Sequence, residues 1–295
     1  MVMAVKQLVF EKHHETDNNG FQIKVIRGKT FGCRWHFHPE YELTLTLQGT
    51  GYRVVGDSIA SLEKNDLVLV GSNLPHLWEA DGGRQDDPLV HAIVVHFRED
   101  FLGPDFFHQP LTNPLKKVLE EARRGVQLFG ESHRLIVRLL IQLVDEPSKL
   151  RQAIGLLRIL RLIATTDQFS RLSSPGFIPE LNAFDAKRVD RICQFVRSNL
   201  DRKIYLREAA IQVGLSEGAF SRYFKSRVGK TFTEFVNEVR VERACRLLST
   251  QGSRITEVAA KCGFDNLSNF NRQFRKIKQM SPSQYRESWH QGSSP

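Results

Sequence analysis

The chain has 295 residues, a length that favours two domains over one. Its composition, 41% hydrophobic and 25% charged, is that of a folded protein and excludes a disordered or collagen-like one. The net charge of +9 is uneven, because residues 181–295 hold 21 basic and 11 acidic side chains (+10), which leaves 21 and 22 (−1) for residues 1–180. A basic second part joined to a nearly neutral first part indicates a polyanionic partner for the second.

The sequence predicts a cytoplasmic protein with no membrane partner. The most apolar stretch, Leu135–Val144, is interrupted by Arg138 and Gln142 and is too short to span a bilayer. The first residues lack the basic and apolar regions of a secretory signal. The cysteines are widely separated, at Cys33, Cys193, Cys245 and Cys262. Without paired spacing they are expected to be reduced thiols.

Residues 1–110 are predicted to form a β-sandwich or small barrel. Between Phe21 and Phe97 the apolar period is mostly two, as in the alternation of Leu43–Gln48. Glycine-containing turns such as Gly49–Gly51 interrupt the apolar runs at short intervals. Many short strands separated by turns are typical of these architectures.

Residues 111–169 are predicted to be helical. The apolar period becomes helical over Leu115–Ala122, Leu135–Val144 and Ile154–Ile163. The wide apolar arcs of these helices suit packing on the barrel, on one another or across a homodimer, and the sequence leaves these alternatives open.

Residues 170–184 are predicted to be a linker, because Ser, Pro and Gly are frequent in the first ten of them. Residues 185–290 are predicted to form an all-helical domain.

The basic part contains a duplicated helix-turn-helix pattern, at about 206–227 and 255–277. Leu206, Glu208, Ala210 and Gly214 align with Ile255, Glu257, Ala259 and Gly263, and Phe220, Arg222 and Phe224 then align with Phe270, Arg272 and Phe274. A small alanine lets two helices approach closely, and the glycine supplies a left-handed turn. The second helix of each copy presents arginine and polar residues outward, as a helix that enters the major groove must. A helical hairpin with a solvated basic face is the alternative, which two matching copies in a +10 segment make the weaker interpretation.

Between the two copies, Thr231–Leu248 is predicted to be one amphipathic helix. At ~1.5 Å per residue it is roughly 27 Å long. Such a spacer can set two recognition helices about one duplex turn, ~34 Å, apart, so that each chain reads two successive major-groove segments.

This segment, about Val189–Glu287, resembles the DNA-binding domain of the AraC/XylS family of bacterial transcription regulators. The motifs that carry the resemblance are Leu215–Lys225, Arg240–Leu248, Ile255–Phe264 and Ser281–Arg286. Gln279 stands where the family usually has glycine, a departure that concerns the local helix end. The resemblance implies a bacterial protein that binds double-stranded promoter DNA, contacts RNA polymerase and forms a homodimer. Activation is the family's usual mode, and the sequence does not establish the sign of regulation.

The resemblance also implies which side chains contact DNA. Contacts to bases or to the groove are implied for Gly218, Ser221, Arg222, Leu267, Ser268, Asn271 and Arg272. Arginine can pair with guanine and asparagine with adenine. The flanking basic residues Lys225, Arg275 and Lys276 are assigned to phosphates, where they add affinity without sequence information. A surface salt bridge is the alternative role for Arg222 and Arg272.

The neutral part of the chain contains a cluster of potential metal ligands. His36 and His38 share one face of a strand, Glu42 follows shortly after them, and His76 lies further along. Three imidazoles and a carboxylate are a sufficient ligand set for a divalent metal with open positions.

The spacing of these residues resembles the motifs of cupin barrels over about Gly32–Trp78. The fold class predicted is therefore two-domain α+β: a cupin-like N-terminal β-barrel with packed helices, and an all-α C-terminal domain with two helix-turn-helix motifs joined by a long helix. The chain departs from metal-binding cupins because it lacks the Pro-x-Gly before His76 and has Ala80 where asparagine is usual. We therefore expect no cofactor, with a divalent metal on His36, His38, Glu42 and His76 as the alternative.

The residues expected to bind a small-molecule effector share the inward parity of the strands. They are Arg34, His36, His38, Glu42, His76 and Trp78. Trp35 or Tyr41 would replace some of them if the parity were off by one residue. Polar groups beside an aromatic plane suit a hydroxylated molecule such as a sugar.

The predicted function is a sequence-specific transcriptional regulator controlled by this effector, and not an enzyme. The enzymatic alternative is a metal-dependent cupin fused to a DNA-binding domain, for which no second catalytic motif is present. An architectural DNA-binding protein is a third alternative, which leaves the whole first part unexplained.

Overall fold

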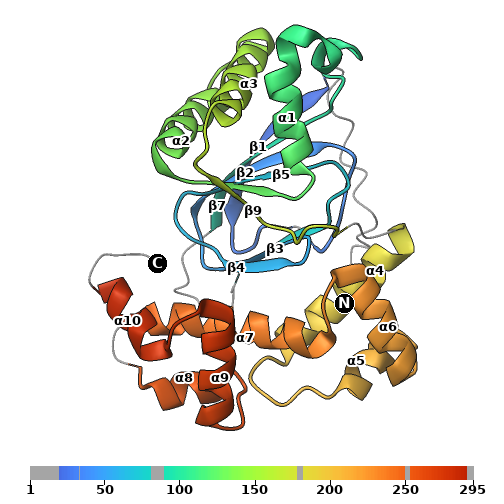
Figure 1. Ribbon diagram of the computed structural model, residues 1–295, viewed down its shortest axis with the longest axis vertical. Coiled ribbons are helices and arrows are strands. Elements are labelled where there is room, and N and C mark those ends of the chain that lie inside the picture. Colours follow the sequence, from blue (N-terminus) through green and yellow to red (C-terminus); the bar gives the residue numbers. More distant parts are fainter. Residues whose placement is uncertain (1–19, 33, 81–89, 178–181, 250–252, 291–295) are drawn as a thin grey trace, which may run out of the picture.

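The computed structural model describes residues 20–32, 34–80, 90–177, 182–249 and 253–290. Figure 1 shows two domains: two sheets with helices α1–α3 form one, and helices α4–α10 form the other. The predicted two-domain α+β fold, with an all-helical second domain, is confirmed.

The first domain contains a six-stranded and a three-stranded sheet. The larger sheet has the order β1 (Phe21–Gly28), β7 (Val90–Phe97), β2 (Tyr41–Gln48), β5 (Asp66–Val70), β8 (Val126–Leu128), β9 (Phe169–Arg171). The smaller sheet has the order β4 (Ser58–Ser61), β3 (Gly51–Val55), β6 (His76–Ala80). Within the described residues the two sheets stay separate rather than closing into one barrel. A backbone bridge joins His36, which lies in the segment before β2, to His76 of β6.

The alternation in β2 separates two buried environments rather than core from solvent. Leu43 and Leu45 lie in one apolar core with α1 (Asn113–Ala122), α2 (Gly130–Val144) and α3 (Lys149–Ala164). The residues between them, Glu42 and Thr44, are equally buried and line a cavity of the domain. The polar residues of β2 are therefore buried, whereas the polar residues of an alternating strand usually face solvent.

Short helical turns at Phe106–His108 and Pro110–Thr112 lead into α1. Downstream of α3, part of the predicted linker lies against the first domain. The backbone N–H groups of Leu172 and Ser173 donate to the carbonyls of Gly125 and Arg124, at 2.9 and 2.7 Å.

The second domain consists of seven helices in the described residues. They are α4 (Ala183–Ser198), α5 (Leu206–Gln212), α6 (Glu217–Val228), α7 (Phe232–Ser249), α8 (Ile255–Lys261), α9 (Leu267–Lys278) and α10 (Pro282–His290). The helix predicted between the two motifs is α7, and the two helix-turn-helix units are α5–α6 and α8–α9.

The two units are built alike. Gly214 and Gly263 have φ angles of 67° and 73°, the left-handed turn for which the sequence provides glycine. Each recognition helix then begins at a capping side chain: Ser216 accepts from the backbone of Ala219, and Asn266 from that of Asn269. Gln279 ends α9 at φ 57°, so it adopts the left-handed conformation that Gly229 supplies at the end of α6.

The described helices include none that is both long and apolar enough to cross a lipid bilayer. Cys193, Cys245 and Cys262 are buried free thiols, and Cys33 lies outside the described residues.

The two turn glycines differ in their surroundings, which gives a matched test of the packing. We expect Gly263→Ala to destabilise the protein more than Gly214→Ala does. Both substitutions place a side chain at positive φ, which costs about 1 kcal/mol. A Cβ at position 263 would also lie 2.2 Å from the carbonyl oxygen of Leu200 and 2.8 Å from Nη2 of Arg240, whereas none of the described atoms lies within 4 Å at position 214.

The additional loss in free energy of unfolding expected for Gly263→Ala is about 1–3 kcal/mol, the usual cost of overpacking. Urea unfolding followed by circular dichroism measures both variants, and equal losses would contradict the close packing around Gly263.

Candidate ligand site and nucleic-acid interface

A buried carboxylate lies at the centre of the first domain. The Nε2 atoms of three histidines surround Oε2 of Glu42, at 2.9 Å for His96, 3.3 Å for His38 and 3.4 Å for His76. One ligand atom each from His36, His38, Glu42 and His76 lies within 4.8 Å of the others. His96 comes close because it is directly opposite Glu42 in the pairing of β2 with β7.

The imidazoles determine the charge of Glu42. Burial alone would raise the pKa of this carboxyl, but His76 and hydrogen bonds from His38, His76 and His96 together hold it well below its usual range. Burial lowers the pKa of His36 well below 6.5, and the charges of His76 and His38 act in the same direction. Burial also lowers the pKa of His38. The cluster therefore keeps an ionised carboxylate beside two rings, those of His36 and His38, whose protonation is disfavoured.

The tautomers of these histidines are set by the backbone. Nδ1 of each ring lies close to a backbone carbonyl oxygen. The distances are 2.6 Å from His36 to Arg34, 3.1 Å from His38 to Glu40 and 2.7 Å from His76 to Leu74. A carbonyl oxygen only accepts, so Nδ1 carries the hydrogen in each ring. Nε2 of a neutral ring then turns a lone pair toward its surroundings.

This arrangement calls for a positive charge in the cluster. Nε2 of His38 and Nε2 of His76 lie 3.3 and 3.4 Å from Oε2 of Glu42, distances at which a proton or a cation has to lie between the nitrogen and the oxygen. Bonds of 2.0–2.1 Å around a tetrahedral metal place its ligand atoms ~3.4 Å apart. The distances from Glu42 to His38 and His76 are close to this separation, and the backbone carbonyls hold the orientation of both rings.

A cavity of about 300 Å³ adjoins the cluster. It is lined by Lys24, Ile26, Phe31, Gly32, His36, Glu42, Thr44, Trp78, Val94 and His96. The hydroxyl of Thr44 donates to Oε1 of Glu42 at 2.6 Å. The lining thus combines charged and hydrogen-bonding groups with the aromatic rings of Phe31 and Trp78, which is the composition of a small-molecule site.

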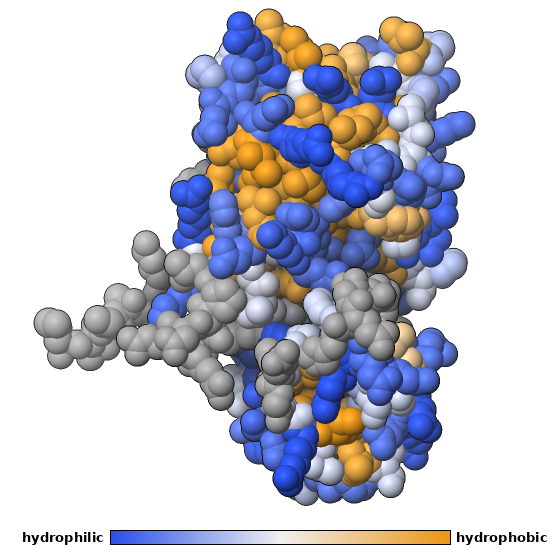
Figure 2. All heavy atoms as spheres, turned by 90° about the vertical axis from the view of Figure 1, so that its left-hand side faces the viewer, coloured by the Kyte–Doolittle hydropathy of each residue, from blue (hydrophilic) through white to orange (hydrophobic). Residues whose placement is uncertain are grey.

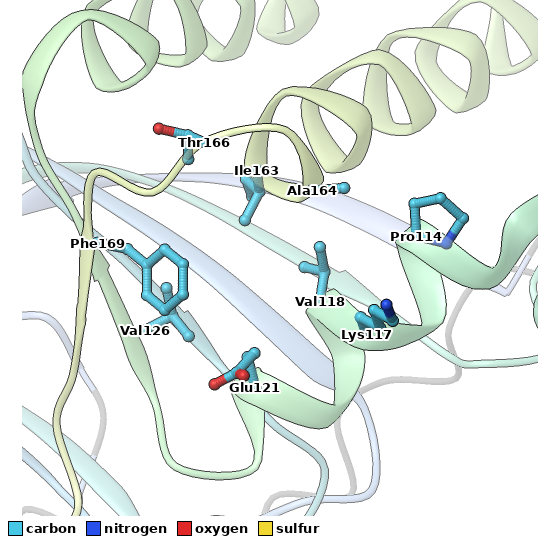
Figure 3. A pocket seen from close by; sticks show the side chains of 9 residues that line it. All are labelled: Pro114, Lys117, Val118, Glu121, Val126, Ile163, Ala164, Thr166 and Phe169. Carbon is cyan, nitrogen blue, oxygen red and sulfur yellow. The ribbon is translucent and has the colours of Figure 1, made fainter.

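A second cavity, of about 280 Å³, lies between α1, α3, β8 and β9 (Figure 3). Its walls are mostly apolar, with Val118 and Ile163 facing Phe169 across the opening. Of its two charged residues, Glu121 is paired with Arg171 and Lys117 is exposed. Because its polar groups do not converge, the second cavity is the weaker candidate.

The structure distributes the six predicted effector residues over three places. His36, Glu42 and Trp78 line the first cavity, while His38 and His76 contact Glu42 without lining it. Arg34 is exposed, and its Nη1 lies 3.7 Å from Oδ2 of Asp190 in α4.

Neither alternative residue lies in the cavity lining. Trp35 is buried in a core shared with α4, and Tyr41 stacks on Phe97 on the opposite face of β2.

Seven residues that line the cavity were absent from the sequence prediction: Lys24, Ile26, Phe31, Gly32, Thr44, Val94 and His96. The alternation of β2 carries a signal for Thr44, which is two residues from Glu42. His96 gives no such signal, because its proximity depends on the pairing of β2 with β7.

The predicted DNA contacts lie on the two recognition helices, α6 and α9. Nine of the ten are exposed: Gly218, Ser221, Arg222, Lys225, Leu267, Ser268, Arg272, Arg275 and Lys276. Asn271 is partly exposed. The opposite side of each helix is fixed in a core by a pair of phenylalanines, Phe220 with Phe224 and Phe270 with Phe274, all fully buried. Each unit therefore presents a polar and basic helix face on a rigid base.

Comparison with known proteins matches both domains. Residues 24–143 match the family described as AraC-like ligand binding domain, and residues 209–288 match a helix-turn-helix domain family. The chain is 32% identical over 279 residues to the probable transcriptional regulator LumQ of Photobacterium leiognathi, covering 92% of this chain and 98% of LumQ. It is 22% identical over 256 residues to the transcriptional activator RhaS of Klebsiella pneumoniae, covering 85% of this chain and 87% of RhaS.

Among solved structures, ToxT from Vibrio cholerae aligns over 91% of this chain and 98% of its own length, loosely, with 14% identity and a TM-score of 0.36.

A ligand-binding domain joined to two helix-turn-helix units defines a DNA-binding transcriptional regulator. The chain belongs to the AraC family of these regulators. Its relatives are regulators rather than enzymes, so the predicted non-enzymatic function is confirmed and the metal-dependent enzyme has no support.

Proposed function

We propose that a small hydroxylated molecule, such as a sugar, binds in the first cavity and controls how the two helix-turn-helix units engage promoter DNA. The observation that carries the proposal is the lining itself. Glu42, Thr44 and His96 offer hydrogen-bond partners on one side, and Trp78 offers an aromatic plane. A molecule that prefers one arrangement of the protein shifts the population toward that arrangement.

The effector class is tested by titrating the full chain with neutral sugars, sugar acids and aliphatic acids of matched size, followed by calorimetry. A hydroxylated compound is expected to bind, and Trp78→Ala should weaken its binding about threefold to tenfold through loss of the aromatic contact. Trp289→Phe, which alters a tryptophan of α10, is the matched control. Binding of aliphatic acids alone would overturn the proposal.

We expect some side chains of the recognition helices to contact bases and others to contact phosphates. Arg222 and Arg272 suit guanine and Asn271 suits adenine, while Gly218, Ser221, Leu267 and Ser268 shape the contact with the groove. The basic residues near the ends of the helices, Lys225, Arg275 and Lys276, suit phosphates.

Arg272 and Lys276 lie on the same exposed helix and test this division. With DNA selected by the chain from a random pool, Arg272→Ala should cost about 1–3 kcal/mol and relax the preference at one base pair. Lys276→Ala should weaken binding to all sequences and reduce the salt slope by about 1. Titrations at several salt concentrations measure both, and an Arg272→Ala protein with unchanged sequence preference would count against the base contact.

A second function of the cluster, favoured by its tautomers, is to hold a divalent cation on His36, His38, Glu42 and His76. The cation would bind the Nε2 atoms of the histidines and balance the charge of Glu42. It would also offer open coordination positions to hydroxyl oxygens of the effector.

Elemental mass spectrometry of the untagged full chain tests the cation. About one equivalent of metal is expected in the wild type, and a His36→Ala/His38→Ala variant should lose it. Metal-free wild-type protein that gains no thermal stability from added Zn²⁺ would reject the cation and leave the histidines as hydrogen-bonding groups.

We further propose that the protein acts in the bacterial cytoplasm as a homodimer that activates transcription through RNA polymerase. The name of RhaS, a transcriptional activator, supports activation. Figure 2 shows apolar side chains gathered on the side of the first domain that carries α2 and α3. The exposed apolar residues of these helices are Leu135, Ile141, Leu150 and Ile154, of which Leu150 is 71% exposed.

Such a patch is self-complementary in a twofold dimer. Sedimentation of an Ile154→Glu variant, expected to be monomeric, tests this interface.

A further inference from the structure

The three-stranded sheet separates the cavity from the DNA-binding domain. On its inner face, Trp78 of β6 lines the cavity and His76 contacts Glu42. On its outer face, Leu77 belongs to the apolar core that contains Val189 and other residues of α4. Because neighbouring residues of a strand point to opposite faces, each residue of β6 that serves the cavity is adjacent to one that serves the domain interface.

An ion pair continues this alternation along β6. Glu79, which follows Trp78, accepts a hydrogen bond from Nη1 of Arg197 in α4 at 2.5 Å. The Glu79 side chain is 14% exposed and that of Arg197 is 47% exposed, so solvent screens the pair in part.

The segment before β2 repeats the arrangement. The ring of His36 lines the cavity, and its backbone is bridged to His76 by hydrogen bonds of 3.1 and 2.9 Å. The preceding residue, Trp35, donates its backbone N–H to Asp190 of α4 at 3.3 Å. Two separate stretches of the chain therefore connect the cavity wall to the same helix.

The second helix-turn-helix unit is attached to the same sheet by a different contact. Glu242 of α7 accepts from the backbone N–H and the hydroxyl of Ser61 in β4, at 2.9 and 2.6 Å. It also accepts from Nζ of Lys278, in the last turn of α9, at 2.8 Å. The first unit is thus connected to this outer face through α4, and the second unit through α7.

Two acidic groups of this interface also have partners inside the DNA-binding domain. Glu242 keeps Lys278, and Asp190 accepts from Nε2 of Gln194 at 2.8 Å. If the domains separate, each of these two carboxylates keeps a partner, so neither becomes an unpaired buried charge, which would be costly. Separation would still expose the apolar core that Trp35 and Leu77 share with α4 and would break the Glu79–Arg197 pair, so the interface opens only at a cost in free energy.

We propose that the outer face of the three-stranded sheet, together with Arg34 and Trp35, is the coupling surface through which the cavity and the DNA-binding domain influence each other, with the Glu79–Arg197 pair as its principal polar contact. This inference rests on the proposed function and names the contacts that connect the cavity to the DNA-binding domain. Because coupling between two sites is reciprocal, DNA must change the affinity of the cavity for the effector by the same factor by which the effector changes the affinity for DNA, and we expect this effect of DNA to act through the cavity wall. The coupling is therefore testable with DNA as the only probe.

The experiment is hydrogen–deuterium exchange of the full chain with and without saturating duplex DNA that the wild type selects from a random pool. We expect DNA to change the exchange rates of amides in residues 34–38 and in β6 at least threefold. In Glu79→Arg saturated with the same DNA this change should disappear, and in the charge-swapped Glu79→Arg/Arg197→Glu variant it should return. Recovery in the swapped variant separates coupling from damage to the fold.

Two further variants complete the test. Glu121→Arg breaks the ion pair with Arg171, away from the domain interface, and should leave the DNA-induced change intact. Ser61→Ala removes one donor to Glu242 while Lys278 stays paired, and should reduce the change only in part.

Identical exchange of the cavity wall with and without DNA would overturn the proposal, as would a DNA-induced change that survives in Glu79→Arg. Failure of the proposed function gives a different result. In that case no hydroxylated ligand binds in the titrations, while the DNA-induced change at the cavity wall persists and depends on Glu79.

Discussion

The arrangement of this protein depends on one constraint: the strands at the centre of its first domain are covered on both faces. Successive side chains of a strand point in opposite directions, so each central strand must serve two buried environments at once. In β2, Leu43 and Leu45 serve the helices while Glu42 and Thr44 serve the cavity. In β6 the second environment is another domain. Ligand chemistry and domain contact are therefore one residue apart, and neither can change without displacing the other.

The two functional surfaces use charge in opposite ways. Glu42 is buried, and a buried carboxylate without compensation would cost far more free energy than the domain could tolerate. Imidazoles from three segments of the chain compensate its charge. The basic residues of α6 and α9 stay in solvent, where salt screens them and each contributes little alone. In the proposed function, the buried cluster provides selectivity for the molecule that enters the cavity. The exposed set provides affinity that depends on the ionic strength of the surroundings.

Local signals made the DNA-binding domain predictable from the sequence. A glycine in the turn, alanines at the helix crossing and paired phenylalanines all act within some twenty residues, and their duplication confirms the pattern. Gln279 shows the limit of such reasoning, since the chain adopts the left-handed conformation there without the expected glycine. The hydrogen bond from the Gln279 side chain to the carbonyl oxygen of Lys276 helps to hold this helix end.

The ligand site was only partly predictable, because long-range pairing builds it. The spacing of His36, His38 and Glu42 placed them together, but His96 joins them through a strand more than fifty residues away. Arg34 has the parity of its neighbours and yet lies at the domain interface, because the segment before β2 is irregular rather than a continuous strand. The alternation of side chains predicts which residues face the cavity only where the strand is regular.

The core of the second domain is divided within α7. Phe235 and Val239 belong to a core that continues into Trp35, Tyr52 and Leu77 of the first domain, whereas Cys245 and Leu248 belong to a core formed only by α7–α10. The second helix-turn-helix unit thus has a self-contained interior and can open as a separate cooperative unit. The first unit shares its interior with the sheet, so it can fray only together with that sheet. The two helix-turn-helix units therefore differ in how independently they can fold. The first unit, which shares its core with the first domain, is the one that packs against the wall of the cavity.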